Sequence, residues 1–186
     1  MKLNSRNVFL DLDLSLPNLR AFGLLCHLDS GSGISQAKKQ LLDITPHCCM
    51  LKRLFIKGYI DIESENFGSK ILVNTTARFI SGFAQEMVLN EKLNIFLDGE
   101  LNRSDLRSFG ILSKLDTGEG VKDFRKIFFG IFGSFLPTKN LCEKNYVSRS
   151  KGRLYVNPDA RRGSGFAQGK GECGFEIPKT EEMVYK

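Results

Sequence analysis

A duplicated stretch of sequence limits what this chain can fold into more than any other feature. Residues 8–33 align with residues 95–120 at a constant offset of 87, and 13 of the 26 positions are identical. The offset then falls to 83, and residues 73–85 align with residues 156–168. Two blocks in the same order indicate repeated structural units. The change in offset predicts a loop tip between the blocks, because loop tips tolerate changes in length.

The duplication divides the 186-residue chain into two small domains. We call their aligned sequences the first repeat (residues 8–85) and the second repeat (residues 95–168). A unit of roughly 80 residues can bury only a modest core, so we expect the two units to pack on each other. The expected boundaries are a first domain at 1–76, a connecting helix or linker at 77–93, a second domain at 94–168 and a flexible C-terminal tail at 169–186.

The overall charge favours a polyanionic partner, since the net charge is +6 and the isoelectric point is near 9.1. Nucleic acid is expected before an acidic membrane surface. A hydrophobic content of 41% is typical of a soluble globular protein. The sequence shows neither a signal peptide nor an apolar run long enough to span a membrane. We therefore expect a cytoplasmic protein that is nucleoid-associated when bound to DNA, with no membrane contact and no small-molecule ligand.

The reactive residue types show no arrangement that predicts catalysis or metal binding. Five cysteines occur without a CxxC pair and with only two histidines, which favours reduced thiols over disulfides or a zinc site. The sequence also lacks a glycine-rich phosphate loop, a spaced carboxylate pair and a nucleophile with a partner histidine. We therefore expect no enzymatic activity, no catalytic residue, no metal and no cofactor.

The first repeat shows the pattern of a strand, three helices and a two-stranded hairpin. Alternating apolar and polar residues predict a half-buried strand at 7–14. Thr45 followed by Pro46 is typical of a helix N-terminus, and Gly58 of a helix end. The remaining expected elements are a helix from Pro17 to the glycines that follow Asp29, a short helix at 34–43, a strand at 59–62, a hairpin loop at 63–69 and a strand at 70–74.

The second repeat follows the same scheme with a damaged third helix. Gly133 and Pro137 fall where that helix aligns, and a proline inside a helix costs about 3 kcal/mol. We therefore expect only a short helix that begins near Pro137. The other expected elements are a strand at 95–101, helices at 105–116 and 121–132, and a hairpin at 146–157. A group of phenylalanines, Phe124, Phe128, Phe129, Phe132 and Phe135, is expected to pack between the domains or in a dimer rather than to stack on bases.

This order of elements resembles the winged helix-turn-helix family. The resemblance covers about residues 8–74, and it is carried by Thr45 at the start of the third helix, Leu54 four residues before Gly58, and the Tyr59–Ile60 pair. It implies an α+β fold of two tandem winged helix-turn-helix domains. Each would have a three-helix core and a β-hairpin wing, and the second would be divergent.

The resemblance also implies where DNA would bind. DNA-binding members of the family place the third helix in the major groove, where Arg53 would read guanine and Lys52 would hold a phosphate. A basic wing in the second domain would contact the backbone or enter a minor groove. Alternatively, these charges only solvate exposed faces, and the adjacent Cys48 and Cys49 are small residues near DNA or a thiol sensor. The expected DNA-binding residues are Lys38, Lys39, Thr45, Cys48, Cys49, Lys52, Arg53, Lys70, Arg149, Lys151, Arg153, Arg161 and Arg162.

The function expected from these features is double-stranded-DNA binding by a sequence-specific transcriptional regulator. The first alternative is a plasmid- or phage-type replication initiator, since residues 154–163 resemble a segment of such proteins. The second is a protein-interaction scaffold, a role that other tandem winged-helix proteins have. A duplicated chain can cover two half-sites as a monomer, and a homodimer is the other arrangement.

Overall fold

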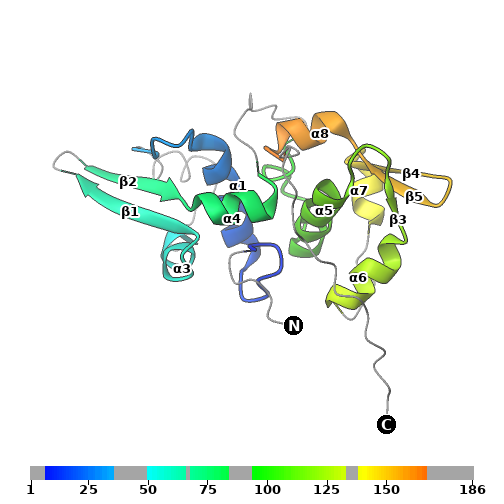
Figure 1. The fold of residues 1–186 in the computed structure, drawn as a ribbon, viewed down its shortest axis with the longest axis horizontal. Helices are drawn as coiled ribbons and strands as arrows, with labels where there is room; N and C mark the ends of the chain where they lie inside the picture. The colour runs from blue at the N-terminus through cyan, green and yellow to red at the C-terminus, as the bar shows by residue number, and fades with distance from the viewer. Residues whose placement is uncertain (1–6, 36–49, 66–67, 84–93, 133–137, 167–186) are drawn as a thin grey trace, which may run out of the picture.

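The computed structural model has an α+β fold with a two-stranded sheet and a three-stranded sheet at opposite ends of a helical middle layer (Figure 1). It describes residues 7–35, 50–65, 68–83, 94–132 and 138–166. The helices are α1 (Leu16–Leu28), α3 (Met50–Ile56), α4 (Thr75–Ser81), α5 (Arg103–Leu115), α6 (Phe124–Phe132), α7 (Lys139–Glu143) and α8 (Pro158–Gly163). The strands are β1 (Ile60–Glu65), β2 (Gly68–Val73), β3 (Val121–Lys122), β4 (Val147–Ser150) and β5 (Arg153–Val156).

The two repeats share one arrangement of elements. In the second repeat β3, β5 and β4 form an antiparallel sheet in that order. In the first repeat β1 pairs with β2, and a single bridge from Ile34 to Ile71 takes the place of β3. A short helix follows each hairpin, and the side chains of Asn74 and Asn157 cap these helices by accepting two backbone N–H groups each.

A buried aspartate ties the first long helix of each repeat to its hairpin. One carboxylate oxygen of Asp29 accepts from the N–H groups of the two glycines that follow it (2.8 and 3.1 Å), and the other accepts from Val73 (2.7 Å). Asp116 makes the same three hydrogen bonds, the last one to Val156 at 2.6 Å. The shared LD(S/T)GxG sequence therefore holds the helix end, the glycine turn and the second hairpin strand together.

The strands predicted at 7–14 and 95–101 are wrong, because both segments form consecutive turns. The side chain of Asn7 accepts from the N–H of Phe9 at 3.2 Å, and the side chain of Asn94 accepts from the N–H of Phe96 at 3.0 Å. Such local side-chain hydrogen bonds compete with the ladder of a sheet. The turns bury Phe9 together with its neighbours Val8 and Leu10, whereas an alternating strand would have exposed it.

Other predicted bounds shift by a few residues. The expected boundary between residues 76 and 77 falls inside α4, which ends at Ser81 because Gly82 adopts a left-handed conformation with φ 77°. The expected helix at 121–132 begins only at Phe124, after the two residues of β3. The short helix expected near Pro137 is confirmed as α7. The helix expected from Thr45 to the residue before Gly58 is present as α3 in its described part, and its residues 45–49 lie outside the described residues. The expected helix at 34–43, apart from Ile34 in its bridge and Ser35, the remainder of the linker and the C-terminal tail also lie outside them.

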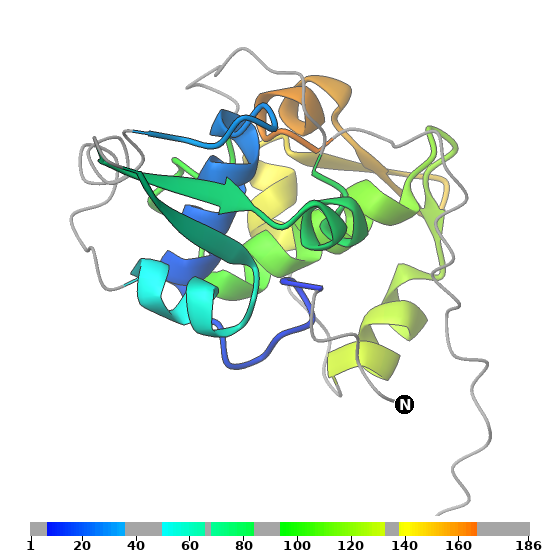
Figure 2. The ribbon, with the colours of Figure 1, turned by 60° about the vertical axis from the view of Figure 1, so that its left-hand side comes forward.

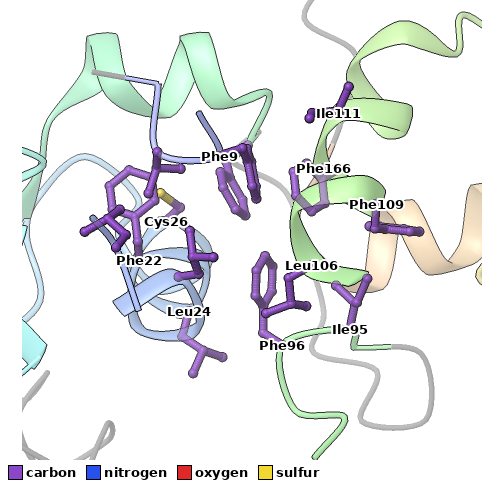
Figure 3. Packing of buried hydrophobic residues seen from close by; sticks show 14 of the residues in the cluster. Phe9, Phe22, Leu24, Cys26, Ile95, Phe96, Leu106, Phe109, Ile111 and Phe166 are labelled. Carbon is purple, nitrogen blue, oxygen red and sulfur yellow. The ribbon is translucent and has the colours of Figure 1, made fainter. Parts of the chain in front are cut away.

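The repeats pack on each other through two reciprocal contacts between a glycine and a phenylalanine. The ring of Phe96, from the second repeat, lies on Gly23 of α1, and a Cβ atom at Gly23 would be 2.4 Å from ring carbons. The ring of Phe9, from the first repeat, lies on Gly110 of α5, where a Cβ atom would be 2.6 Å away. Figure 3 shows both rings between α1 and α5. Because each contact repeats the other with the repeats exchanged, the two halves are related by an approximate two-fold axis.

Phe83 and Phe166 meet at the centre of this interface. Their backbones form an antiparallel bridge, and their rings stack with centroids 4.4 Å apart. The two residues occupy equivalent positions, so this contact joins a position to its own counterpart. The phenylalanines that were expected to pack between the domains lie elsewhere. Phe124 and Phe128 contact each other on α6, at the outer side of the second repeat (Figure 1), and Phe129 is 58% exposed. Packing between the domains is therefore a wrong prediction for these three side chains. Packing in a dimer stays a prediction.

Two equivalent arginines also cross the interface. Nη2 of Arg20 donates to two backbone carbonyl oxygens of the turn at 98–101 (2.6 and 2.8 Å). Nη2 of Arg107 donates to two carbonyl oxygens of the turn at 11–14. Burial, with Arg103 nearby, lowers the pKa of Arg107 to about 10, so its guanidinium remains charged at neutral pH. These bonds fix the turns that directly follow those carrying Phe9 and Phe96.

Over the described residues, no helix has the length and apolar character needed to cross a membrane.

We expect Gly23→Ala to lower the free energy of unfolding by about 1 to 3 kcal/mol, which is the usual cost of overpacking a core. The new Cβ atom would have to displace the ring of Phe96, which is itself buried. Urea denaturation of the full chain measures the change. Gly99→Ala is the matched control, since nothing lies within 4 Å of its Cβ position, and we expect a change within about 0.5 kcal/mol. Equal effects of the two substitutions would contradict the tight contact at Gly23.

His27 on α1 predicts a pH-dependent contribution to stability. It lies next to Gly165 of the second repeat, its Nδ1 has no hydrogen-bond partner, and burial lowers its pKa from the ordinary value of 6.5. The folded state therefore favours the neutral ring, whereas the unfolded chain protonates more readily. The contribution is complete above pH 6.5 and is lost as the pH falls through the lowered folded-state pKa.

We expect the wild-type protein to lose more stability between pH 8 and pH 5 than His27→Gln, which cannot titrate. Urea midpoints at both pH values measure the difference. The equivalent residue, Lys114, already donates from Nζ to the backbone oxygen of Ile80 at 2.5 Å. His27→Lys should therefore also remove the pH-dependent loss. Identical losses in the wild type and in His27→Gln would exclude this role.

Candidate nucleic-acid interface

A groove between the first turn of α6 and the hairpin of β4 and β5 is strongly charged. Its volume is about 500 Å³, and five cations and one carboxylate line it. Cations that converge from two elements on one groove favour a polyanionic ligand. The lining residues are Asp123, Phe124, Arg125, Lys126, Arg149, Ser150, Lys151, Gly152 and Arg153.

The hairpin side of the groove follows from its turn. Arg149 pairs with Leu154 and Ser150 pairs with Arg153, which leaves a two-residue turn of Lys151 and Gly152. Both turn residues have positive φ, 46° and 73°, and this is the conformation of the tight turns that suit a twisted hairpin. The three cations of the hairpin, Arg149, Lys151 and Arg153, therefore lie in this turn or directly beside it.

The two hairpin arginines are held in place by contacts that leave other donors available. The guanidinium of Arg149 lies 5.6 Å from the centre of the Phe124 ring and donates to the hydroxyl of Thr138. Nη1 of Arg153 donates to the backbone oxygens of Glu119 and Gly120 (3.0 and 3.4 Å). An arginine has five N–H donors, so each retains donors for a ligand. Such positioning reduces the side-chain entropy that binding would otherwise cost.

The helix side of the groove comes from the first turn of α6. Asp123 takes a left-handed conformation with φ 55° and turns the chain from β3 into the helix. Its backbone oxygen accepts from the N–H groups of Lys126 and Ile127 (2.9 and 3.2 Å). Arg125 and Lys126 are exposed on this first turn and face the hairpin across the groove.

Arg161 and Arg162, expected on the basic wing, do not lie on the hairpin. The chain leaves β5 at Val156 and enters α8, which carries both arginines. Nη2 of Arg161 donates to the backbone oxygen of Asp116 at 2.6 Å, and burial lowers the pKa of Arg161. Arg162 forms an ion pair with Asp159 one turn earlier on the same helix. Nearness in sequence therefore grouped with the wing two arginines that the structure places on α8.

Sequence analysis missed Arg125 and Lys126, although a signal for them was present. At the offset of 87 they align with Lys38 and Lys39, which were expected to contact phosphates. The repeat thus preserves a pair of basic residues at one position in both halves. Lys38 and Lys39 lie outside the described residues, as do Thr45, Cys48 and Cys49.

The third helix of the first repeat presents both charged and apolar side chains to solvent. Lys52 and Arg53 are exposed on α3, and Arg53 lies 3.8 Å from Asp13, a distance and exposure at which an ion pair contributes little. On the same helix, Phe55 and Ile56 are 47% and 62% exposed. Figure 2 shows α3 below the hairpin of β1 and β2. Lys70, the remaining expected site residue, is on β2 opposite Glu63.

A charged network attaches the residues that follow α3 to the turn at 11–14. Nζ of Lys57 lies 2.7 Å from both carboxylate oxygens of Asp11 and 3.0 Å from Asp13, and the hydroxyl of Tyr59 donates to Asp11 at 3.0 Å. Burial opposes the charge of Lys57, but the hydrogen bonds to the two aspartates outweigh it and raise the pKa of Lys57. The equivalent residues of the second repeat, 98, 144 and 146, repeat the network. Lys57 is therefore a structural cation and not part of a binding surface.

Metal binding by a side-chain cluster and reactivity of Cys26 find no support in the parts of the chain that the structure describes. There, no group of three or more His, Cys, Asp or Glu side chains is placed to hold a metal ion. Cys26 is fully buried, and burial raises the pKa of its thiol, so the reactive thiolate is disfavoured.

Comparison with protein-family models, with curated proteins and with solved structures gives no match.

We expect Arg161→Ala to lower the free energy of unfolding by about 1 to 3 kcal/mol, because it removes a charged donor from the buried backbone oxygen of Asp116. Lys151→Ala, at the exposed hairpin turn, should stay within about 0.5 kcal/mol of the wild type. Thermal and urea unfolding of both variants measure the changes. A stable Arg161→Ala variant would show that Arg161 is free for another role.

Proposed function

We propose that this protein binds double-stranded DNA and that the groove between α6 and the β4–β5 hairpin holds the phosphate backbone. The observation that carries the proposal is the convergence of five cations from two elements on a groove with a single carboxylate. Arginine and lysine are the principal phosphate-binding side chains, and two of the arginines are already held in position.

The proposal includes a tandem winged helix-turn-helix architecture. It is supported by the order of elements described in each repeat: a long helix, a strand or bridge, a short helix that ends before a Gly or Asn, and a hairpin, with α6 between the strand and the short helix in the second repeat. The sheet order β3-β5-β4 places the hairpin beside the short strand, as a wing requires. In this architecture α3 is the helix that reads bases, and Lys52 and Arg53 lie on its exposed face.

The biological role that we propose is transcriptional regulation by a cytoplasmic, nucleoid-associated protein. Its support is the exposure of Lys52 and Arg53 on α3, the helix that reads bases in this architecture.

A second candidate function is a protein-interaction module. One observation favours it: α3, the helix expected in the major groove, exposes Phe55 and Ile56 beside Lys52 and Arg53. Exposed apolar side chains that gather on one helix are typical of protein-binding surfaces.

We expect the full chain to bind a mixed-sequence duplex, with an affinity that falls steeply as salt rises. Fluorescence anisotropy measures binding at several salt concentrations. Each lost phosphate contact lowers the slope of log K against log salt by about 0.9, so Lys126→Ala/Lys151→Ala should lower it by about 2. Lys126 and Lys151 are exposed on the two sides of the groove.

Arg162→Ala is the matched control, because Arg162 is an exposed cation paired with Asp159 on α8, away from the groove. Its salt slope should equal that of the wild type. Arg53→Ala would report on base reading by α3, as a change in the preference among duplex sequences. Absence of binding to any duplex at low salt would reject DNA binding and bring the protein-interaction module forward.

A further inference from the structure

The two hairpins are equivalent in structure but opposite in charge. Their pairing starts at the same place, with Ile60 opposite Val73 and Val147 opposite Val156. Between residues 60 and 73 the sequence has three carboxylates and one lysine, whereas between residues 147 and 156 it has three cations and no carboxylate. One repeat therefore carries an acidic hairpin and the other a basic one.

The difference is concentrated in three consecutive positions. The shared register places Asp61, Ile62 and Glu63 where the second repeat has Ser148, Arg149 and Ser150. All six residues are exposed. At the central position, an isoleucine that is 41% exposed takes the place of the arginine that lies over Phe124. The sequence alignment also places Ala37 at the position of Phe124.

The charge difference has opposite consequences near a phosphate backbone. Duplex DNA carries one negative charge per about 1.7 Å of its axis, so carboxylates brought against it are repelled. Lys70 offers only one cation against Asp61, Glu63 and Glu65, and it pairs in register with Glu63. The first hairpin is also the longer one, with strands of six residues against four, and in Figure 1 it projects from the helical layer. If it bound as a wing, it would carry its carboxylates onto the backbone.

We propose that only the second hairpin contacts the phosphate backbone and that its carboxylates hold the first hairpin away from DNA. This inference rests on the proposed function and specifies how it is carried out. Hairpin contacts to the phosphate backbone are then made at one end of the molecule only, by the β4–β5 hairpin together with the first turn of α6. Both repeats therefore have the same fold, but only the second has a hairpin whose charges suit a phosphate backbone.

Chemical-shift mapping of the ¹⁵N-labelled full chain with a mixed-sequence duplex tests the proposal. We expect amide shifts at residues 148–153 and 124–127 and none at residues 60–63 and 69–73. Shifts at both hairpins, or at the first alone, would overturn the inference while leaving DNA binding intact. A chain that shows no binding by anisotropy would overturn the proposed function itself.

Reciprocal exchange of the three differing positions tests the cause. Ser148→Asp/Arg149→Ile/Ser150→Glu gives the second hairpin the residues of the first, and we expect at least a tenfold loss of affinity near 0.1 M salt. Asp61→Ser/Ile62→Arg/Glu63→Ser is the matched exchange, and we expect it to bring amide shifts to residues 60–63 for the first time. Thermal melting verifies that both variants are folded.

Two results would overturn the inference even if the wild type binds DNA. The first is undiminished affinity of the variant with an acidic second hairpin, which would show that the basic hairpin is not the contact. The second is a first hairpin that remains unshifted after the exchange, which would show that its charge is not what holds it away.

Discussion

The fold depends on the absence of a side chain at two positions. Gly23 and Gly110 let a phenylalanine ring from the opposite repeat lie directly on a helix backbone, and Arg20 and Arg107 fix the turns that follow these rings. The buried apolar residues of both halves form one continuous cluster through this interface. Units this small bury little surface alone, so neither sheet, hairpin nor groove is independent of the contact. The groove lies far from the glycines in sequence, yet its elements stand on the core that the glycines make possible.

The sequence predicted the repeated units and the residues that form turns and end helices. The duplication, the glycine turns after Asp29 and Asp116, the hairpins and the short α7 could all be predicted, because each has a local signal that does not depend on a distant partner. The turns at Phe9 and Phe96 could not be predicted, because alternating apolar and polar residues are typical of a strand. Two facts that only the structure gives override this pattern: no strand that the structure describes pairs with these segments, and an asparagine at the start of each turn accepts a hydrogen bond from the backbone N–H two residues later. The interface was missed for the same reason: its rings are scattered over the chain, whereas the phenylalanines that cluster in sequence lie elsewhere.

The candidate site was predicted in part. Arg149, Lys151 and Arg153 could be identified as a basic hairpin because a two-residue turn fixes where they lie. Counting charges along the chain also assigned to the wing Arg161 and Arg162, which lie on the helix after the hairpin, where Arg161 bonds to the backbone of Asp116. It omitted Arg125 and Lys126, which are 23 or more residues away in sequence and reach the groove only through the three-stranded sheet. A site formed by two elements is visible in sequence only when the fold that joins them is known.

The near-equivalence of the two sides of the interface has a consequence for how chains recognise one another. The surface by which the first repeat binds the second is the same on any copy of the molecule, so a first repeat can in principle close on the second repeat of a neighbouring chain with every contact preserved. Closure within one chain prevails because the covalent link keeps the local concentration of the correct partner high. Concentration, and not any change in the contacts, would then decide between a self-contained monomer and an exchanged dimer that holds two basic grooves in one particle.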